Sequence, residues 1–228
     1  MSIPDSEVQR AYRVRVVIFL ACALVAVVAL LTIWQAIGAL VRLDAVENER
    51  DRWQRPDDVI AALGLRQGGT VLDLGCGSGY FTVRLSSAVG ASGEVLAEDV
   101  RRLPLAFLWI RTVLRRTHNV QVVLGQIDDP EIGNRTLDGA LIANTFHELG
   151  HPETILDHIR RALRPGGRLV VVDRGPRASN AEERGHEIPR ELVERELAAA
   201  GFEVVDRKDP FIDRPDDDLW WLIVARKR

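Results

Sequence analysis

The feature that most constrains this chain is a glycine-rich turn between an apolar strand pattern and an amphipathic helix pattern. The strand pattern covers Thr70–Leu74, the glycines are Gly75, Gly77 and Gly79, and the helix pattern begins near Phe81. A short apolar run, a tight turn and a 3.6-residue period are typical of the first half of a βαβ unit. Glycines also let a ligand approach the N–H groups at the start of a helix. The sequence therefore predicts an α/β unit with a ligand site at this turn.

The spacing of the glycines separates two classes of nucleotide-binding protein. The dinucleotide-binding pattern is Gly-x-Gly-x-x-Gly, whereas this chain has Gly-x-Gly-x-Gly from Gly75 to Gly79. Asp73 precedes the turn inside the apolar strand, where an unpaired carboxylate is costly to bury. A cationic or hydroxyl-bearing ligand would satisfy it. The spacing disfavours a dehydrogenase.

A second acid follows at the end of the next strand pattern, Gly93–Asp99. Open α/β folds place a carboxylate about 20 residues past the glycine turn, where it accepts hydrogen bonds from the two ribose hydroxyls. Asp99 has this position. Glu98 is the competing candidate, and a solvated acid at the strand end is the alternative.

The loop after the fourth strand pattern, Leu137–Asn144, contains a candidate base. Ligands of open α/β sheets bind at the carboxyl edge, which this loop occupies. His147 titrates near neutral pH when unperturbed and is suited to general-base catalysis; a structural histidine is the alternative. The run from His147 to His151 also spells His-Glu-x-x-His. That zinc motif requires a continuous helix, which Gly150 and Pro152 interrupt, so we expect no metal site.

Three stretches together resemble the class I S-adenosylmethionine-dependent methyltransferases, of the ubiquinone/menaquinone-biosynthesis type. These are the Asp73–Gly79 segment, the strand end at Asp99 and the turn Pro165-Gly166-Gly167 before an apolar strand. The resemblance extends from about Trp53 to the C-terminus. It implies a seven-stranded, mostly parallel sheet with one antiparallel strand and helices on both faces.

The resemblance also implies S-adenosylmethionine as cofactor and a small-molecule substrate. Related enzymes often carry an acid just after the third strand that accepts from the adenine amino group. This chain has Gln126 there, so Asp128 or the backbone of Ile127 is expected to take that role. The implied cofactor-binding residues are Asp73, Gly75, Cys76, Gly77, Gly79, Tyr80, Asp99, Asp128 and Asn144, and His147 is the expected base.

The N-terminal part predicts a membrane anchor, because residues 16–41 contain no charged side chain and about 20 apolar residues span a bilayer. A signal peptide or a buried core helix are the alternatives. We expect a tail at 1–15, a transmembrane helix at 16–41, a linker or pre-motif segment at 42–58 and the methyltransferase domain at 59–228. In that segment Trp53 is expected to cover the cofactor or to anchor the chain.

Orientation and partners follow from charge. The arginines of the N-terminal tail favour a cytoplasmic N-terminus, which would export the catalytic domain. S-adenosylmethionine, however, is cytoplasmic, which favours the opposite orientation. We expect a single-pass membrane protein with a cytoplasmic catalytic domain. The net charge of −3 disfavours nucleic-acid binding, and the two cysteines imply no disulfide framework. A hydrophobic substrate is expected, and a membrane-anchored protein that binds S-adenosylmethionine without turnover is the alternative function.

Two further segments carry expectations. The helix pattern 101–117 is apolar nearly all round, and its only charges are arginines: Arg101, Arg102, Arg111, Arg115 and Arg116. We hypothesise that it rests on a membrane surface with Trp109 at the interface; an ordinary docking helix is the alternative. The polar loop 174–187 is long enough to cover a pocket, and His186 near its end either faces the substrate or begins a helix.

Overall fold

The computed structural model describes residues 5–176, 186–214 and 219–227 of the 228-residue chain. It consists of two compact units, residues 1–52 and Trp53–Arg228. The described residues of the first unit belong to one helix, α1 (Asp5–Gln54), whose last residues are counted in the second unit. Within α1, Tyr12–Ala39 form a stretch long and apolar enough to cross a membrane.

The helix α1 includes the expected transmembrane range and most of the expected linker, and it ends at Gln54, just before Arg55 and Pro56. Arg55 adopts a left-handed conformation, with φ of 53°, and Pro56 opens the next helix, α2 (Pro56–Leu63). A residue before proline is disfavoured in the right-handed helical region, so the helix stops there. Trp53 packs against Trp220, with ring centroids 5.9 Å apart, which favours the expectation that it anchors the chain on the domain.

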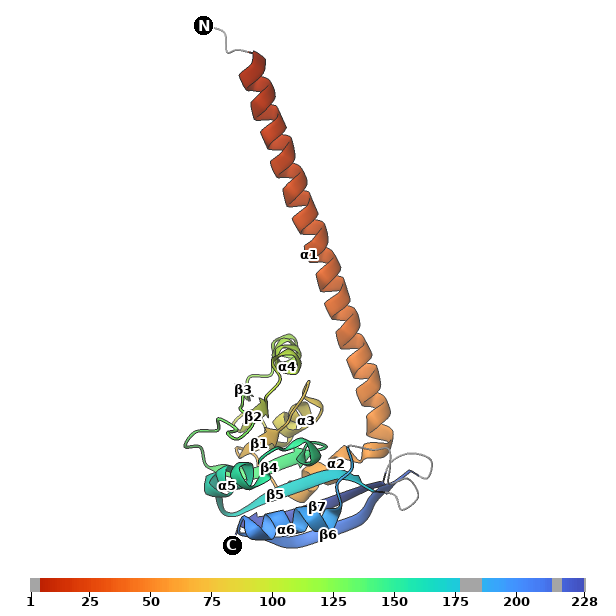
Figure 1. Cartoon of the computed structure of the whole chain (residues 1–228), viewed down its shortest axis with the longest axis vertical. Coiled ribbons are helices and arrows are strands. Elements are labelled where there is room, and N and C mark those ends of the chain that lie inside the picture. The colour runs from red at the N-terminus through yellow and green to blue at the C-terminus, as the bar shows by residue number, and fades with distance from the viewer. Residues whose placement is uncertain (1–4, 177–185, 215–218, 228) are drawn as a thin grey trace. The chain divides into compact units, whose positions relative to one another are not determined.

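The second unit is built on a seven-stranded sheet in the order β3-β2-β1-β4-β5-β7-β6, shown in Figure 1. β7 runs antiparallel to both β5 and β6, and the remaining pairs are parallel. The prediction of a class I methyltransferase sheet is confirmed. The strands are β1 (Thr70–Leu74), β2 (Glu94–Asp99), β3 (Val120–Leu124), β4 (Leu137–Ala143), β5 (Leu163–Gly175), β6 (Phe202–Asp213) and β7 (Leu219–Lys227).

Helices alternate with the parallel strands and cover the two faces of the sheet (Figure 1). They are α3 (Tyr80–Val89), α4 (Arg102–Leu114), the short 3₁₀ helix η1 (Phe146–Glu148), α5 (Pro152–Ala162) and α6 (Arg190–Ala199). Successive strand residues point to opposite faces. Leu141 of β4 therefore packs with α2 and α3, whereas its neighbour Ile142 packs with α5 and α6. Both cores lie entirely within the second unit.

The strand order fixes where a ligand can bind. The chain passes from β1 outward to β2 and β3, then returns to pair β4 on the other side of β1. The connections leave the carboxyl ends of β1 and β4 in opposite directions, so a crevice opens there. The glycine turn follows β1 and the His147 loop follows β4, and the topology brings these two segments to one edge.

Two strands differ from the sequence-based expectation. β5 begins at Leu163, so the expected turn at Pro165–Gly167 lies within its range, next to a register shift against β4 between Leu137 and Gly139. β6 continues to Asp213 rather than ending near Arg207, with register shifts against β7 that accommodate the extra residues. The local apolar periodicity of the sequence does not predict such irregular strand pairing, because a bulge changes which residues face the core.

Removing a core side chain from β4 tests this account of the fold. Leu141 is fully buried, and we expect Leu141→Ala to lower the unfolding free energy of a 53–228 fragment by about 2–5 kcal/mol through lost burial and a residual cavity. Urea unfolding measures the change. Val205→Ala is the control, since Val205 of β6 is exposed and should change stability by less than about 0.5 kcal/mol. Equal effects of the two substitutions would contradict the assignment of the core.

Candidate functional site

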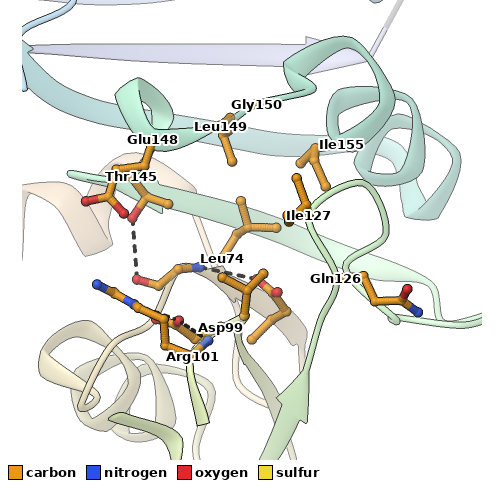
Figure 2. Close-up of a pocket in the computed structure, with 13 residues that line it drawn as sticks. Leu74, Asp99, Arg101, Gln126, Ile127, Thr145, Glu148, Leu149, Gly150 and Ile155 are labelled. Atoms are coloured by element: carbon orange, nitrogen blue, oxygen red, sulfur yellow. Dashed lines mark hydrogen bonds and ion pairs between the residues drawn. The ribbon is translucent and has the colours of Figure 1, made fainter. Parts of the chain in front are cut away.

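A pocket lies at the carboxyl ends of β1, β2 and β4, where the strand order opens the sheet; Figure 2 shows the residues around it. The glycine turn, the end of β2, the loop after β3 and the loop after β4 each contribute to its wall. The lining residues are Leu74, Gly75, Glu98, Asp99, Val100, Arg101, Gln126, Ile127, Thr145, Glu148, Leu149, Gly150 and Ile155.

The conformation of the turn explains its glycines. Gly75 has φ of 69°, and a Cβ there would lie 2.3 Å from Cγ2 of Thr145, so only glycine lets β1 and the loop after β4 approach this closely. The Thr145 hydroxyl lies 3.4 Å from the Gly75 carbonyl oxygen (Figure 2). Gly77 has φ of 56°, and no atom of the other described residues, its two chain neighbours apart, lies within 4 Å of the position of a Cβ. The backbone at Gly77 is therefore open to an approaching ligand.

Neighbouring elements hold the turn in place. The Cys76 N–H donates to the Glu98 carbonyl oxygen over 2.8 Å, and the Gly77 N–H donates to Oδ2 of Asp99 over 3.0 Å. From α4, Nη1 of Arg111 donates to the Ser78 carbonyl oxygen over 2.6 Å. The turn is thus braced by β2 and by α4 before any ligand binds.

The position of Arg111 corrects the sequence-based hypothesis for this helix. Arg111 was expected at lipid phosphates with the other arginines of the segment, but it is 3 % exposed and bonded to the turn. The apolar periodicity around it gave no indication of this role, because its partner lies 33 residues earlier in the sequence.

Three carboxyl groups are buried beneath the turn: Asp73, Glu98 and Asp99. Burial raises the pKa of Asp73 to about 7; a hydrogen bond from Thr82, 2.6 Å long, opposes this shift, and the charge of Asp99 adds to it. Burial likewise raises the pKa of Glu98 to about 7, again with the neighbouring acids adding to the shift. The ligand-free site therefore concentrates negative charge that bound donors or cations would stabilise.

Asp99 has protein partners on both carboxylate oxygens. The Arg101 backbone N–H donates to Oδ1 over 2.8 Å, and its guanidinium lies 3.1 Å from Oδ1 and 3.2 Å from Oδ2. This pairing raises the pKa of Arg101. The Arg101 side chain is half exposed whereas that of Asp99 is buried, so the arginine can leave the carboxylate without opening the core. Glu98 lines the same pocket, with Oε2 3.4 Å from the Gly75 nitrogen, and remains the competing acid.

His147 lies in η1 and is held by a residue that the sequence did not single out. Its Nδ1 is 2.9 Å from Oδ1 of Asp173, at the end of β5, and its backbone N–H donates to Oδ2 over 3.2 Å. Asp173 is fully buried. An ionised carboxylate can only accept, so opposite an ionised Asp173 the neutral imidazole carries its proton on Nδ1 and has a lone pair on Nε2. Nε2 is buried and makes no hydrogen bond to any residue that the structure describes.

Two ionisable groups surround this nitrogen. Oε1 of Glu148 lies 3.7 Å from it, and the His186 ring stands edge-on to the His147 ring with centroids 5.5 Å apart. Ligand atoms of His147, Glu148 and His186 all lie within 4.8 Å of one another. The zinc-protease geometry is absent from this loop, because η1 ends at Glu148 and His151 precedes α5 instead of sharing a helix with His147.

Comparisons with known proteins agree with this geometry. Residues 71–167 match a methyltransferase domain family. A demethylmenaquinone methyltransferase of Geobacillus sp. is 26 % identical over 132 residues, covering 58 % of this chain and 56 % of that protein. A ubiquinone/menaquinone biosynthesis C-methyltransferase of Pasteurella multocida is 33 % identical over 124 residues, covering 53 % and 45 %. The matches thus span about half of these relatives.

A crystal structure extends the likeness to the whole fold. The S-adenosylmethionine-dependent methyltransferase from Aquifex aeolicus superimposes with a TM-score of 0.66 at 26 % identity, covering 75 % of this chain and 88 % of that one. The folded unit has the fold of the class I S-adenosylmethionine-dependent methyltransferases, and its residues 71–167 match a methyltransferase domain family. Its cofactor is S-adenosylmethionine, and the residues present fit that molecule. The ammonium group and the ribose hydroxyls of S-adenosylmethionine are donors that the buried acids can accept from, with Arg101 free to move away from Asp99, and Gly77 carries no side chain that would block the approach.

The remaining residues that were expected to bind the cofactor have different surroundings. Asn144 follows β4 directly and has a left-handed conformation, and its buried Oδ1 makes no hydrogen bond within the described ranges. Cys76 is buried under the turn, where burial and the neighbouring acids raise the pKa of its thiol. Tyr80 packs in the core at the start of α3, and Asp128 is exposed and does not line the pocket. Ile127 does line it, so of the two adenine partners expected from the sequence, the pocket includes only Ile127.

The raised pKa of Glu98 predicts how stability varies with pH. Between its ordinary pKa of 4.5 and about 7, the folded domain holds a proton that the unfolded chain has lost. The contribution of Glu98 to the unfolding free energy is therefore full at low pH and is lost as the pH rises through about 7. We expect Glu98→Gln, which cannot ionise, to gain stability relative to the wild type between about pH 5 and about pH 8. Urea unfolding of the ligand-free domain measures this gain.

The matched control is Glu203→Gln, since Glu203 is an exposed residue of β6. Its stability relative to the wild type should stay constant over the same pH range. A Glu98→Gln variant that loses stability relative to the wild type as the pH rises would contradict the burial of this acid as the source of its shift.

Proposed function

We propose that this protein transfers the methyl group of S-adenosylmethionine to a hydrophobic small molecule at a membrane. The observation that carries the proposal is the Asp173–His147 pair beside the cofactor pocket. The pair joins the loop after β4 to the end of the neighbouring strand β5. Its Nε2, which no residue in the described ranges hydrogen-bonds, lies 3.7 Å from Oε1 of Glu148, and Glu148 lines the pocket.

The chemistry of the pair follows from its hydrogen bonds. Asp173 fixes the ring of His147 through Nδ1, and Nε2 can then accept a proton from an attacking group. When bound, S-adenosylmethionine supplies a methyl group on a positively charged sulfur. The protein has mainly to hold donor and acceptor in line, and it needs a base only where the acceptor loses a proton. The pair therefore favours an acceptor with a removable proton, such as a hydroxyl or an activated ring carbon.

The cofactor-binding proposal assigns the remaining residues to positioning. Gly75 and Gly77 admit the ligand to the backbone, Asp99 or Glu98 accepts from the ribose hydroxyls, and Asp73 lies under the turn as an acceptor for cationic groups. Tyr80, Cys76 and Gly79 shape the start of α3, and Asn144 after β4 presents an oxygen that no described residue hydrogen-bonds. Asp128 is the weakest member of the proposed set because its side chain is exposed, whereas its neighbour Ile127 lines the pocket.

Two observations favour a hydrophobic substrate. The stretch Tyr12–Ala39 can serve as a single membrane span, and two relatives carry names that place them in quinone biosynthesis. A quinone precursor is apolar and reaches an enzyme from the bilayer. We propose that the catalytic domain lies on the cytoplasmic side, where S-adenosylmethionine is made.

Turnover tests the proposal, with demethylmenaquinone as the first substrate assayed. We expect release of S-adenosylhomocysteine by the wild type. His147→Gln should lower kcat by about 10²–10⁴-fold because it removes the base, while calorimetric affinity for S-adenosylmethionine stays unchanged. Asp173→Asn should also lower kcat, since it weakens the group that orients the imidazole.

His151→Gln is the matched control, because His151 is an exposed histidine a few residues along the same loop. This substitution should leave kcat unchanged. EDTA should leave it unchanged as well, since a base must present an Nε2 that is not bound to a metal ion. Cofactor binding without turnover on demethylmenaquinone or on lipid extracts would favour the alternative, a non-catalytic S-adenosylmethionine-binding protein. Full activity of His147→Gln would exclude His147 as the base.

A further inference from the structure

The helix α4 is apolar on two faces, and the sheet uses only one of them. Leu105 and Leu108 are buried against Cys76 and Ala97, which docks the helix on the domain. Four large apolar side chains lie on the exposed part of the helix. Their exposed fractions are 70 % for Leu103, 59 % for Trp109, 56 % for Val113 and 65 % for Leu114. Docking on the sheet therefore does not explain them, and an exposed apolar cluster of this kind indicates an interaction surface.

The charges on this helix have one sign. From Val100 to His118 the chain contains no acidic residue. Arg102, Arg115 and Arg116 are exposed beside the apolar cluster. Arginines around exposed Leu and Trp are typical of helices that lie at the surface of an anionic bilayer, where the guanidinium groups meet lipid phosphates.

Exposed apolar residues also lie at the mouth of the cofactor pocket. Val100 and Ile127 line that pocket and are also 49 % and 67 % exposed. Val100 is separated from α4 by a single residue, Arg101. A surface on which α4 rests would therefore be close to the opening through which a substrate reaches the site.

We propose that Leu103, Trp109, Val113 and Leu114 of α4 dock the catalytic domain on an anionic lipid surface, and that this contact admits a lipophilic substrate from the bilayer. The entry of a lipophilic substrate from the bilayer rests on the proposed function, whereas the docking on lipid does not. A second copy of the chain is a poorer occupant, since a symmetric contact would place the arginines of one copy against those of the other. An anchored chain also keeps the domain near lipid, so a weak surface affinity suffices.

Vesicle co-sedimentation of the 53–228 fragment tests the docking. We expect the fragment to bind vesicles of phosphatidylcholine with phosphatidylglycerol and to bind vesicles of phosphatidylcholine alone much less. Leu103→Gln with Trp109→Gln should weaken binding at least about tenfold, because each removes apolar area from the contact. Arg102→Gln with Arg116→Gln should weaken it as well and reduce its dependence on salt.

The matched control combines Val205→Gln and Arg66→Gln, an exposed apolar and an exposed basic residue outside α4. It should bind vesicles like the wild type. Calorimetric binding of S-adenosylmethionine confirms that each variant is folded. A wild-type fragment that binds the cofactor but not anionic vesicles would overturn the docking and leave the proposed function standing. Loss of vesicle binding in the control variant would equally overturn it, and so would self-association that disappears in Leu103→Gln with Trp109→Gln.

Discussion

The burial of Asp73, Glu98 and Asp99 beneath one glycine turn is the constraint on which the site depends. Carboxyl groups without water or cations are costly, and the fold reduces that cost with hydrogen bonds from Thr82, Gly77 and Arg101. Protonation reduces it further, as the raised pKa values of Asp73 and Glu98 indicate. The site is therefore prepared for a ligand rich in donors and positive charge, which describes S-adenosylmethionine.

The strand order converts this local constraint into a reaction site. Because β4 returns beside β1, the His147 loop lies across from the glycine turn, and the Thr145 side chain occupies the space that a Gly75 side chain would need. Because β5 pairs with β4, Asp173 lies within hydrogen-bond distance of His147. The helix α4 then serves two surfaces: Arg111 braces the turn from its buried side, and the opposite side is left apolar.

Sequence patterns predicted the parts of this site that are local. The glycine turn, the acid at the end of β2 and the histidine after β4 are recognisable because neighbours in the chain define them. Asp173, Thr82 and Arg111 were missed because their partners are distant in sequence or on another element, and nothing in periodicity links them. The full length of β6 was missed because bulges depend on how a strand pairs with its neighbour. The continuous α1 was missed because the end of a helix depends on a helix-breaking residue such as Pro56 more than on composition.

Calorimetric titration of the 53–228 fragment with S-adenosylmethionine and with NAD tests the central claim most directly. The account predicts that S-adenosylmethionine binds with a Kd between about 1 μM and 1 mM, the usual range for enzyme substrates, and that NAD does not bind. Asp99→Ala should abolish binding, whereas Asp206→Ala, an exposed acid of β6, should not. A folded fragment that ignores S-adenosylmethionine, or an Asp99→Ala variant that binds it unchanged, would contradict the account.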